Sequence, residues 1–511
     1  MNDQQETSKR IAKNTLFLYV RMFFLMLISL YTSRVVLKAL GVEDFGIYNV
    51  VGGVVAMFSV ISGSLSASIT RFLNYEMGTG NTYRLKHIFS SSVTTQLLLS
   101  LLIIVLGETI GLWFLNNKIV MAEERYFAAN WVFQLSIITF IINLISVPYN
   151  AAIIAHEKMS AFAYIGIFEG LAKLGVAFLI TVTPYDHLIS YAVLMCFIAI
   201  AIRFTYGRYC GKHFEECNYS FTFDKNLLRD MFAFAGWNFI GAIAGILRDQ
   251  GGNILLNLFC GPLVNAARGI SSQVNHSVSG FVTNFTMALN PQITQSYSSG
   301  KRDYMQVLMF QGAKLSYFIL LILSLPIIIC TPYILHIWLG YYPEFSVSFV
   351  RLTLILSMWE SIAAPVSTGL LATGNIKYYQ ICVGGLNLLN LPVSYFFLRY
   401  GFSPEIVLIV AIVISQLALF MRLYFVKTLL FFNIRTFIWE VYLKILAVTA
   451  IALAIPMLIS FNCKENVFSF VVISIICILT TCFTVWKIGC KKEERVLVKD
   501  YAMKVFKKIK T

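Results

Sequence analysis

Long apolar runs separated by short polar connections follow one another along almost the whole chain. A run of about 20 residues crosses a bilayer as a helix, because each residue advances the helix by about 1.5 Å. The pattern predicts an all-α polytopic membrane protein with about 14 transmembrane helices. The expected spans lie at 14–37, 46–69, 88–114, 128–154, 160–183, 188–207, 231–259, 262–289, 308–332, 346–371, 379–398, 403–425, 441–460 and 466–487.

A polar stripe runs through the eighth of these spans. Its members recur at spacings of three and four, so that a helix places them on one narrow face. They are Arg268, Ser272, Asn275, Ser279, Thr283, Thr286 and Asn290. Because polar side chains are costly in contact with lipid, we expect this face to border a protein interior or a water-filled cavity. The stripe is therefore predicted to line the path of a transporter.

The chain also repeats itself. Gly41 and Gly80 flank the second span, Gly261 and Gly300 flank the eighth, and both pairs are 39 residues apart. The offset of 220 aligns the polar stripe with a small, weakly polar set: Tyr48, Gly52, Val55, Ser59, Gly63, Ser66 and Thr70. A second match places PYNAAIIA at 148–155 on PVSTGLLA at 365–372. These matches predict two pseudo-symmetric six-helix lobes, arranged as parallel repeats that alternate in access, plus two C-terminal helices.

The predicted domain organisation follows from the repeat. It comprises a cytoplasmic N-terminal tail (1–13), an N-terminal lobe (14–207), a cytoplasmic inter-lobe linker (208–230), a C-terminal lobe (231–425), two additional transmembrane helices (426–487) and a basic cytoplasmic tail (488–511).

Composition and charge agree with a membrane protein and set its orientation. The chain is 58% hydrophobic and 13% charged, with a mean hydropathy of +0.74, which excludes an ordinary soluble protein. With both termini in the cytoplasm, the tails and inner loops hold 25 Lys and Arg residues and the outer loops only five. The orientation of the chain in the membrane thus accounts for the net charge of +15, and no nucleic-acid partner is needed to explain it. The basic tail is expected to lie against anionic membrane lipids.

Several classes of chemistry leave no trace in the sequence. No phosphate-binding loop of ATPases, no cluster with metal-ligand spacing and no nucleophile motif is present, so we predict neither catalytic residues nor a metal nor a cofactor. If transport requires energy, we expect that energy to come from an ion gradient or from the chemistry of the substrate.

Charged residues inside the spans are the candidate functional groups. Arg21 is interpreted either as a cavity cation for an anionic headgroup or as a side chain that reaches back to the inner interface. Arg248 and Asp249 are adjacent in the seventh span. We hypothesise that Arg268 pairs with Asp249, which leaves Arg248 free for a ligand.

Three further charges are candidates for ion coupling together with Asp249. Glu169 and Lys173 are four residues apart, a spacing that favours an ion pair within one helix, and a proton-linked pair facing the cleft is the alternative. Glu360 has no charged neighbour in its own span, so it is expected to be protonated or paired across helices.

Two segments resemble Wzx-type polysaccharide flippases of the multidrug/oligosaccharidyl-lipid/polysaccharide exporter superfamily. They are LGVEDFGIYNVVGGVVAMFSVISGSLSASITRFLNYEMGTGN at 40–81 and GPLVNAARGISSQVNHSVSGF at 261–281. The resemblance implies two lobes around a central cavity in the bacterial cytoplasmic (inner) membrane. It also implies transport of undecaprenyl-diphosphate-linked oligosaccharide to the outer leaflet for O-antigen or capsule assembly, with a polysaccharide polymerase and glycosyltransferases as candidate partners.

The candidate residues suit such a substrate. Arg21, Arg248 and Arg268 would meet the diphosphate. Hydrogen-bonding side chains would meet the glycan, and the candidates are Ser272, Asn275, Ser279 and Thr283.

Two alternatives remain. A cation-coupled drug antiporter of the same superfamily usually carries an acidic residue in its first helix, whereas the span 14–37 has none. A membrane-embedded glycan polymerase or ligase generally needs a large outer loop, and the outer loops here are short.

Overall fold

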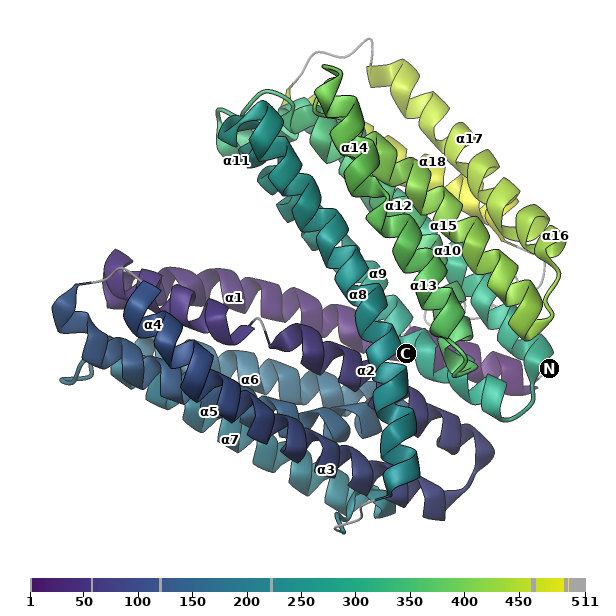
Figure 1. Ribbon diagram of the computed structural model, residues 1–511. Coiled ribbons are helices and arrows are strands. Elements are labelled where there is room, and N and C mark those ends of the chain that lie inside the picture. Colours follow the sequence, from purple (N-terminus) through teal and green to yellow (C-terminus); the bar gives the residue numbers. More distant parts are fainter. Residues whose placement is uncertain are drawn as a thin grey trace, which may run out of the picture. The chain divides into compact units, whose positions relative to one another are not determined.

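The computed structural model describes residues 2–56, 58–118, 122–220, 224–460, 466–490 and 495, and the described residues form helices joined by short connections, with no strand among them (Figure 1). Within this part of the chain, twelve helices are long and apolar enough to cross a membrane. The predicted all-α polytopic class is therefore confirmed. Most of the expected basic tail lies outside the described residues.

The chain divides into two compact units, which we call the N-terminal unit (Ala12–Phe239) and the C-terminal unit (Ile240–Thr511 with Met1–Ile11). The boundary between them falls inside helix α8. The helices that build the N-terminal unit are α1 (Asn2–Ala56), α2 (Ser59–Thr79), α3 (Thr82–Leu106), α4 (Leu112–Lys118), α5 (Tyr126–Ala155), α6 (Met159–Leu179), α7 (His187–His213) and the first part of α8 (Lys225–Cys260). Helices α2, α3 and α5 pack on one another, and α5 and α6 both pack on α7.

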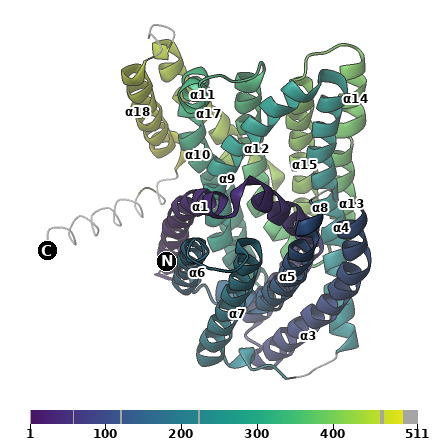
Figure 2. The same ribbon diagram turned by 90° about the vertical axis from the view of Figure 1, so that its left-hand side faces the viewer.

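The C-terminal unit repeats this packing scheme. Its further helices are α9 (Pro262–Ser298), α10 (Arg302–Ile329), α11 (Thr331–Leu339), α12 (Ser346–Ala372), α13 (Lys377–Leu388), α14 (Asn390–Arg399), α15 (Ile406–Leu430), α16 (Ile434–Phe437), α17 (Leu443–Ser460) and α18 (Val467–Thr484). Helices α9, α10 and α12 contact one another, and α12, α13 and α14 contact α15. The last two long helices, α17 and α18, pack on each other and on α10, at the yellow end of the chain in Figure 2.

The backbone itself carries the repeat that the sequence predicted. Gly41 has φ 79° and ψ 171°, and Gly261 has φ 81° and ψ 177°. Gly80 and Gly300 adopt φ 74° and 75°. These values lie where a side chain is strained, so glycine at each position allows a sharp turn between helices. The two matched segments of the second motif contain a proline inside α5 and inside α12.

Two of the fourteen expected spans are missing from the twelve apolar helices, and they are the repeat partners 46–69 and 262–289. The second is a continuous part of α9 and falls short because of its polar stripe. The first is not one helix, because α1 ends at Ala56 and α2 begins at Ser59. Glycines such as Gly52 and Gly63 make this segment a weak helix former, which the apolar pattern alone does not reveal.

One cluster of charges joins three helix ends in the N-terminal unit. Arg125 donates through Nη2 to Oδ2 of Asp44 at 2.7 Å and through Nη1 to Oδ2 of Asp186 at 2.6 Å. Asp186 also caps α7, since its Oδ1 accepts from the backbone N–H groups of Leu188 and Ile189. Burial works to raise the pKa of Asp186, but these N–H donors and Arg125 outweigh it and hold that pKa below its usual range. The cluster fixes α1 just after its turn at Gly41.

Substitution of Gly41 and of its repeat partner Gly261 tests whether both turns require glycine. We expect Gly41→Ala to lower the free energy of unfolding by about 1–3 kcal/mol, because its backbone lies in a region that only glycine tolerates. Nothing lies within 4 Å of the position that the new Cβ would take, so the cost comes from the backbone alone. Thermal unfolding of the purified protein in detergent measures the effect, and Gly261→Ala is expected to behave alike.

The matched controls are Gly46→Ala and Gly269→Ala. Both glycines lie within helices, with surroundings equally open to a Cβ and without a positive φ. Alanine is the better helix former, so both changes should leave stability unchanged or raise it slightly. Equal losses for the test and control substitutions would contradict this account of the turns.

Candidate functional site

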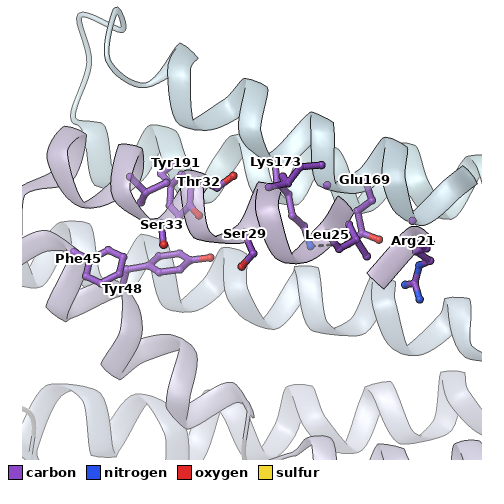
Figure 3. Close-up of a pocket in the computed structure, with 14 residues that line it drawn as sticks. Arg21, Leu25, Ser29, Thr32, Ser33, Phe45, Tyr48, Glu169, Lys173 and Tyr191 are labelled. Atoms are coloured by element: carbon purple, nitrogen blue, oxygen red, sulfur yellow. Dashed lines mark hydrogen bonds and ion pairs between the residues drawn. The ribbon is translucent and has the colours of Figure 1, made fainter. Parts of the chain in front are cut away.

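A polar cavity of about 500 Å³ lies within the N-terminal unit, between α1, α6 and α7. Figure 3 shows its polar side chains following one another along α1, with Glu169 and Lys173 contributed by α6. From α1 come Arg21, Ser29, Thr32 and Ser33. The part of α1 after the turn at Gly41 adds Phe45 and Tyr48, and α7 adds Tyr191. Ser29 and Ser33 are exposed, so the cavity is open to the surface of the unit.

Local sequence explains why this space exists. The lining positions on α1 recur three and four residues apart, which places them on one face of the helix. On α6, Gly166 and Gly170 leave room for them: a Cβ at Gly166 would collide with the guanidinium of Arg21, and one at Gly170 with Leu25. The small residues of α6 therefore accommodate the long side chain of Arg21.

Arg21 is the unusual group in this cavity. Its Nε is buried without a partner, and Arg21 forms no hydrogen bond or ion pair with any residue that the structure describes. Its guanidinium lies over the ring of Phe162, 4.4 Å from the centroid. The other two charges neutralise each other, because Nζ of Lys173 donates to Oε1 of Glu169 at 2.6 Å. The cavity thus keeps one net positive charge, that of Arg21.

The expected pair of Glu169 and Lys173 within one helical turn is present. Both side chains also border the cavity, so the alternative role in ion coupling stays a prediction.

A second cavity, of about 200 Å³, lies on the other side of Tyr48. Its polar lining comes from α5, where Ser136, Thr139 and Asn143 share one face. Gly52 and Val55 also border it. Three members of the small-residue set that aligns with the stripe of α9, Tyr48 among them, therefore border cavities within the N-terminal unit.

The charges of the C-terminal unit are arranged differently from our hypothesis. Arg248 is not free, because its Nη1 donates to Oε1 of Glu360 at 2.5 Å and its Nε to Oδ1 of Asp249 at 3.0 Å. Arg268 is not paired with Asp249 and instead donates to Oγ1 of Thr353 at 2.8 Å. The predicted pairing was wrong because the long side chain of Arg248 reaches the carboxylate of its own neighbour, Asp249, although the angular spacing of adjacent helical residues separates the two.

The polar stripe of α9 forms a seam with α12. Asn275 accepts a hydrogen bond from Ser357 at 2.6 Å, and Asn290 accepts one from Thr368 at 2.9 Å. Ser279 donates to the side chain of Asn275 at 3.0 Å. Other members donate to carbonyl groups of their own helix, for example Ser272 to Arg268 at 3.0 Å. The stripe therefore holds two helices together, and its role in lining a substrate path stays a prediction.

The polar side chains of this seam are not fully buried. Thr283 is exposed, and Arg268, Ser272, Asn275 and Ser279 are half-buried. The exposed face beside the stripe carries two polar residues that the spacing argument passed over, Gln273 and His276.

Sequence reasoning also missed the partners of both polar sets. On α12, Thr353, Ser357 and Glu360 recur at helical spacing, and that periodicity was available as a signal. On α1, the hydroxyl residues Ser29, Thr32 and Ser33 follow Arg21 on the same face and were equally visible.

Comparison with solved structures shows which known proteins share this fold. An outward-facing multidrug resistance MATE family transporter of the MOP superfamily superposes with a TM-score of 0.72 at 11% identity, over 83% of this chain and 96% of that one. The Vibrio cholerae MATE transporter VcmN in its bent form gives 0.66 at 15% identity, over 86% and 99%. The fold is that of the MOP-superfamily transporters, as the resemblance in the sequence implied.

Family models then place the chain more closely. Residues 11–296 match the family described as polysaccharide biosynthesis protein, and the chain belongs to that family. Residues 239–396 match the MatE family. No curated protein sequence matches the chain. Both the family and the fold belong to transporters.

The ion pair between α8 and α12 generates a second prediction. Arg248→Gln should lower the free energy of unfolding by about 1–3 kcal/mol, because it leaves two carboxylates near each other without their cation. Glu360→Gln should cost less, since Asp249 still accepts from Arg248. The double variant should be more stable than the sum of the single losses implies, as thermal unfolding in detergent would measure.

Arg399→Gln is the control, since Arg399 is exposed and, among the described residues, has the hydroxyl of Tyr395 at 3.4 Å as its one hydrogen-bond partner. It should change stability by less than about 0.5 kcal/mol. Strictly additive losses in the double variant would show that Arg248 and Glu360 are not coupled.

Proposed function

We propose that the protein moves undecaprenyl-diphosphate-linked oligosaccharide from the inner to the outer leaflet of the bacterial cytoplasmic membrane by alternating access. The observation that carries this proposal is the cavity of the N-terminal unit with its one uncompensated cation, Arg21, inside a segment that matches the polysaccharide biosynthesis family. Both termini would lie in the cytoplasm. Glycosyltransferases would supply the substrate, and a polysaccharide polymerase would use the product.

The chemistry of the substrate fits the charge of the cavity. A buried cation without a partner is unfavourable, and a diphosphate would supply the missing negative charge together with several hydrogen-bond acceptors. In the C-terminal unit, Arg248 and Arg268 already have protein partners, so Arg21 is the most available of the three candidate arginines for the diphosphate.

A cation-coupled multidrug antiporter is the competing function, and the likeness to MATE transporters favours it at the level of the fold. Charge favours the flippase. A cationic drug would be repelled by Arg21, and the first apolar segment, 14–37, contains no carboxylate to attract it. The carboxylates Glu169, Asp249 and Glu360 are each paired with a cation, which leaves them as candidates for ion coupling only when those pairs open.

Substitution of Arg21 tests the proposal. In a strain whose own copy is deleted, Arg21→Gln should reduce transfer of lipid-linked oligosaccharide at least about tenfold, because a charge-assisted contact to the diphosphate is lost. Unflipped repeat units should accumulate on the cytoplasmic face, where their accessibility to a membrane-impermeant glycan-modifying enzyme measures them. Arg21→Lys should retain part of the activity.

Two matched controls accompany this test. Arg34→Gln removes the same side chain from the same helix at an exposed position outside the cavity and should leave transfer unchanged. Gly166→Ala should reduce transfer by displacing the guanidinium of Arg21, whereas Gly175→Ala meets no atom and should not. Normal transfer in the deletion strain, together with loss of cationic-dye efflux from that strain, would favour the antiporter instead.

A further inference from the structure

Several polar side chains that face the two cavities have no hydrogen-bond partner among the described residues. Serine and threonine in membrane helices commonly donate to a carbonyl of the preceding turn, as Ser146 does to Ile142 and Thr205 to Ala201, both at 2.8 Å. Seven polar side chains that face the cavities do not. No hydrogen bond to any described residue is made by Ser29, Thr32, Tyr48, Ser136, Thr139, Asn143 or Tyr191.

These groups are therefore available to a ligand. The hydroxyl of Thr32 is buried without a partner, which is unfavourable unless a bound molecule or water supplies one. The amide of Asn143 and the hydroxyls of Ser136 and Thr139 point from one face of α5 toward the same space. Each hydroxyl both donates and accepts, and the amide offers two donors and an acceptor. Such a set matches the alternating donors and acceptors of a sugar ring.

Aromatic rings add the apolar surface that a sugar also presents. Tyr48 borders both cavities, and its ring meets that of Tyr191 edge-on, with 4.8 Å between centroids and 65° between planes. Phe45 lies beside it. The faces of such rings suit the C–H side of a pyranose, while their hydroxyls stay available for its oxygen atoms.

Charged groups line the larger cavity and are absent from the lining of the smaller one, so the two ends of the site differ. Arg21 lies at one end of the larger cavity, and Thr32 lies eleven residues further along the same helix, a rise of about 16 Å. The smaller cavity, beyond Tyr48, is lined without any charged residue. The order along the unit is thus a cation, then hydroxyls beside an ion pair, then an aromatic ring, and then an uncharged polar pocket.

We propose that the two sugars nearest the diphosphate bind within the N-terminal unit, one on each side of Tyr48. The inference rests on the proposed function and deepens it: Arg21 holds the diphosphate, the first sugar lies against Ser29 and Thr32, and the second meets Ser136, Thr139 and Asn143. The second sugar is an uncharged one, since its pocket holds no ionised group to pair with an acidic or amino sugar.

Binding by the purified full-length protein tests this inference. Native mass spectrometry would compare two probes: the lipid-linked oligosaccharide extracted from a strain that lacks the protein, and undecaprenyl diphosphate without sugar. Thr32→Val keeps the shape of the side chain and removes its hydroxyl, and Asn143→Leu does the same for an amide. Each should weaken binding of the glycosylated probe roughly fivefold, a factor that corresponds to the loss of one hydrogen bond. Binding of the sugar-free probe should be unaffected.

Controls separate this inference from the proposed function. Thr205→Val removes a hydroxyl that faces away from both cavities and should affect neither probe. Arg21→Gln should weaken both probes alike. If Thr32→Val and Asn143→Leu leave the glycosylated probe unaffected while Arg21→Gln still weakens both probes, the sugar sites are wrong and the flippase proposal stands. If neither probe binds and Arg21→Gln transfers normally in cells, both proposals fail.

Discussion

Polar side chains within membrane-spanning helices must find polar partners, and this requirement governs both units of the molecule. Hydrocarbon offers no hydrogen bonds, so each polar group needs a partner on its own helix, on a neighbouring helix or in a ligand. In the C-terminal unit the partners are side chains of α12, which meet Arg248, Arg268 and Asn275. In the N-terminal unit, Ser146 donates to a carbonyl group of its own helix. Seven of the polar side chains that border the two cavities have no such partner among the described residues.

The repeat makes this difference between the units informative. Glycines with nearly the same positive φ bound the corresponding segments in both halves, and the helices that follow pack in the same order. Yet the two halves fill this frame with different chemistry. The second half has a polar stripe that is hydrogen-bonded to α12. The first half has small residues such as Gly52 at the aligned positions, and it has cavities there. One backbone plan thus supports a hydrogen-bonded seam in one unit and open polar space in the other.

The sequence predicted the features that depend on periodicity and on single residues. Apolar runs located the helices, and glycines at equal spacing located the turns and the repeat, because only glycine tolerates the backbone of Gly41 and Gly261. The sequence did not predict which side chains pair across helices. Helical spacing tells which face Arg248 occupies but not that Glu360, 112 residues away, lies opposite. The break after Ala56 was also missed, since apolar residues continue through it.

Arg21 has no hydrogen-bond or ion-pair partner among the described residues, and this feature links the structure to transport. The other two candidate arginines have protein partners, since Arg248 meets two carboxylates and Arg268 donates to the hydroxyl of a threonine. Removing the partner of a buried charge is costly, so a cation kept without one gains most from an anionic ligand. Under the proposed function, the diphosphate supplies that partner. The same binding brings the glycan to hydroxyl groups that α1 and α5 leave unsatisfied, so that one lipid-linked molecule would supply partners to both cavities.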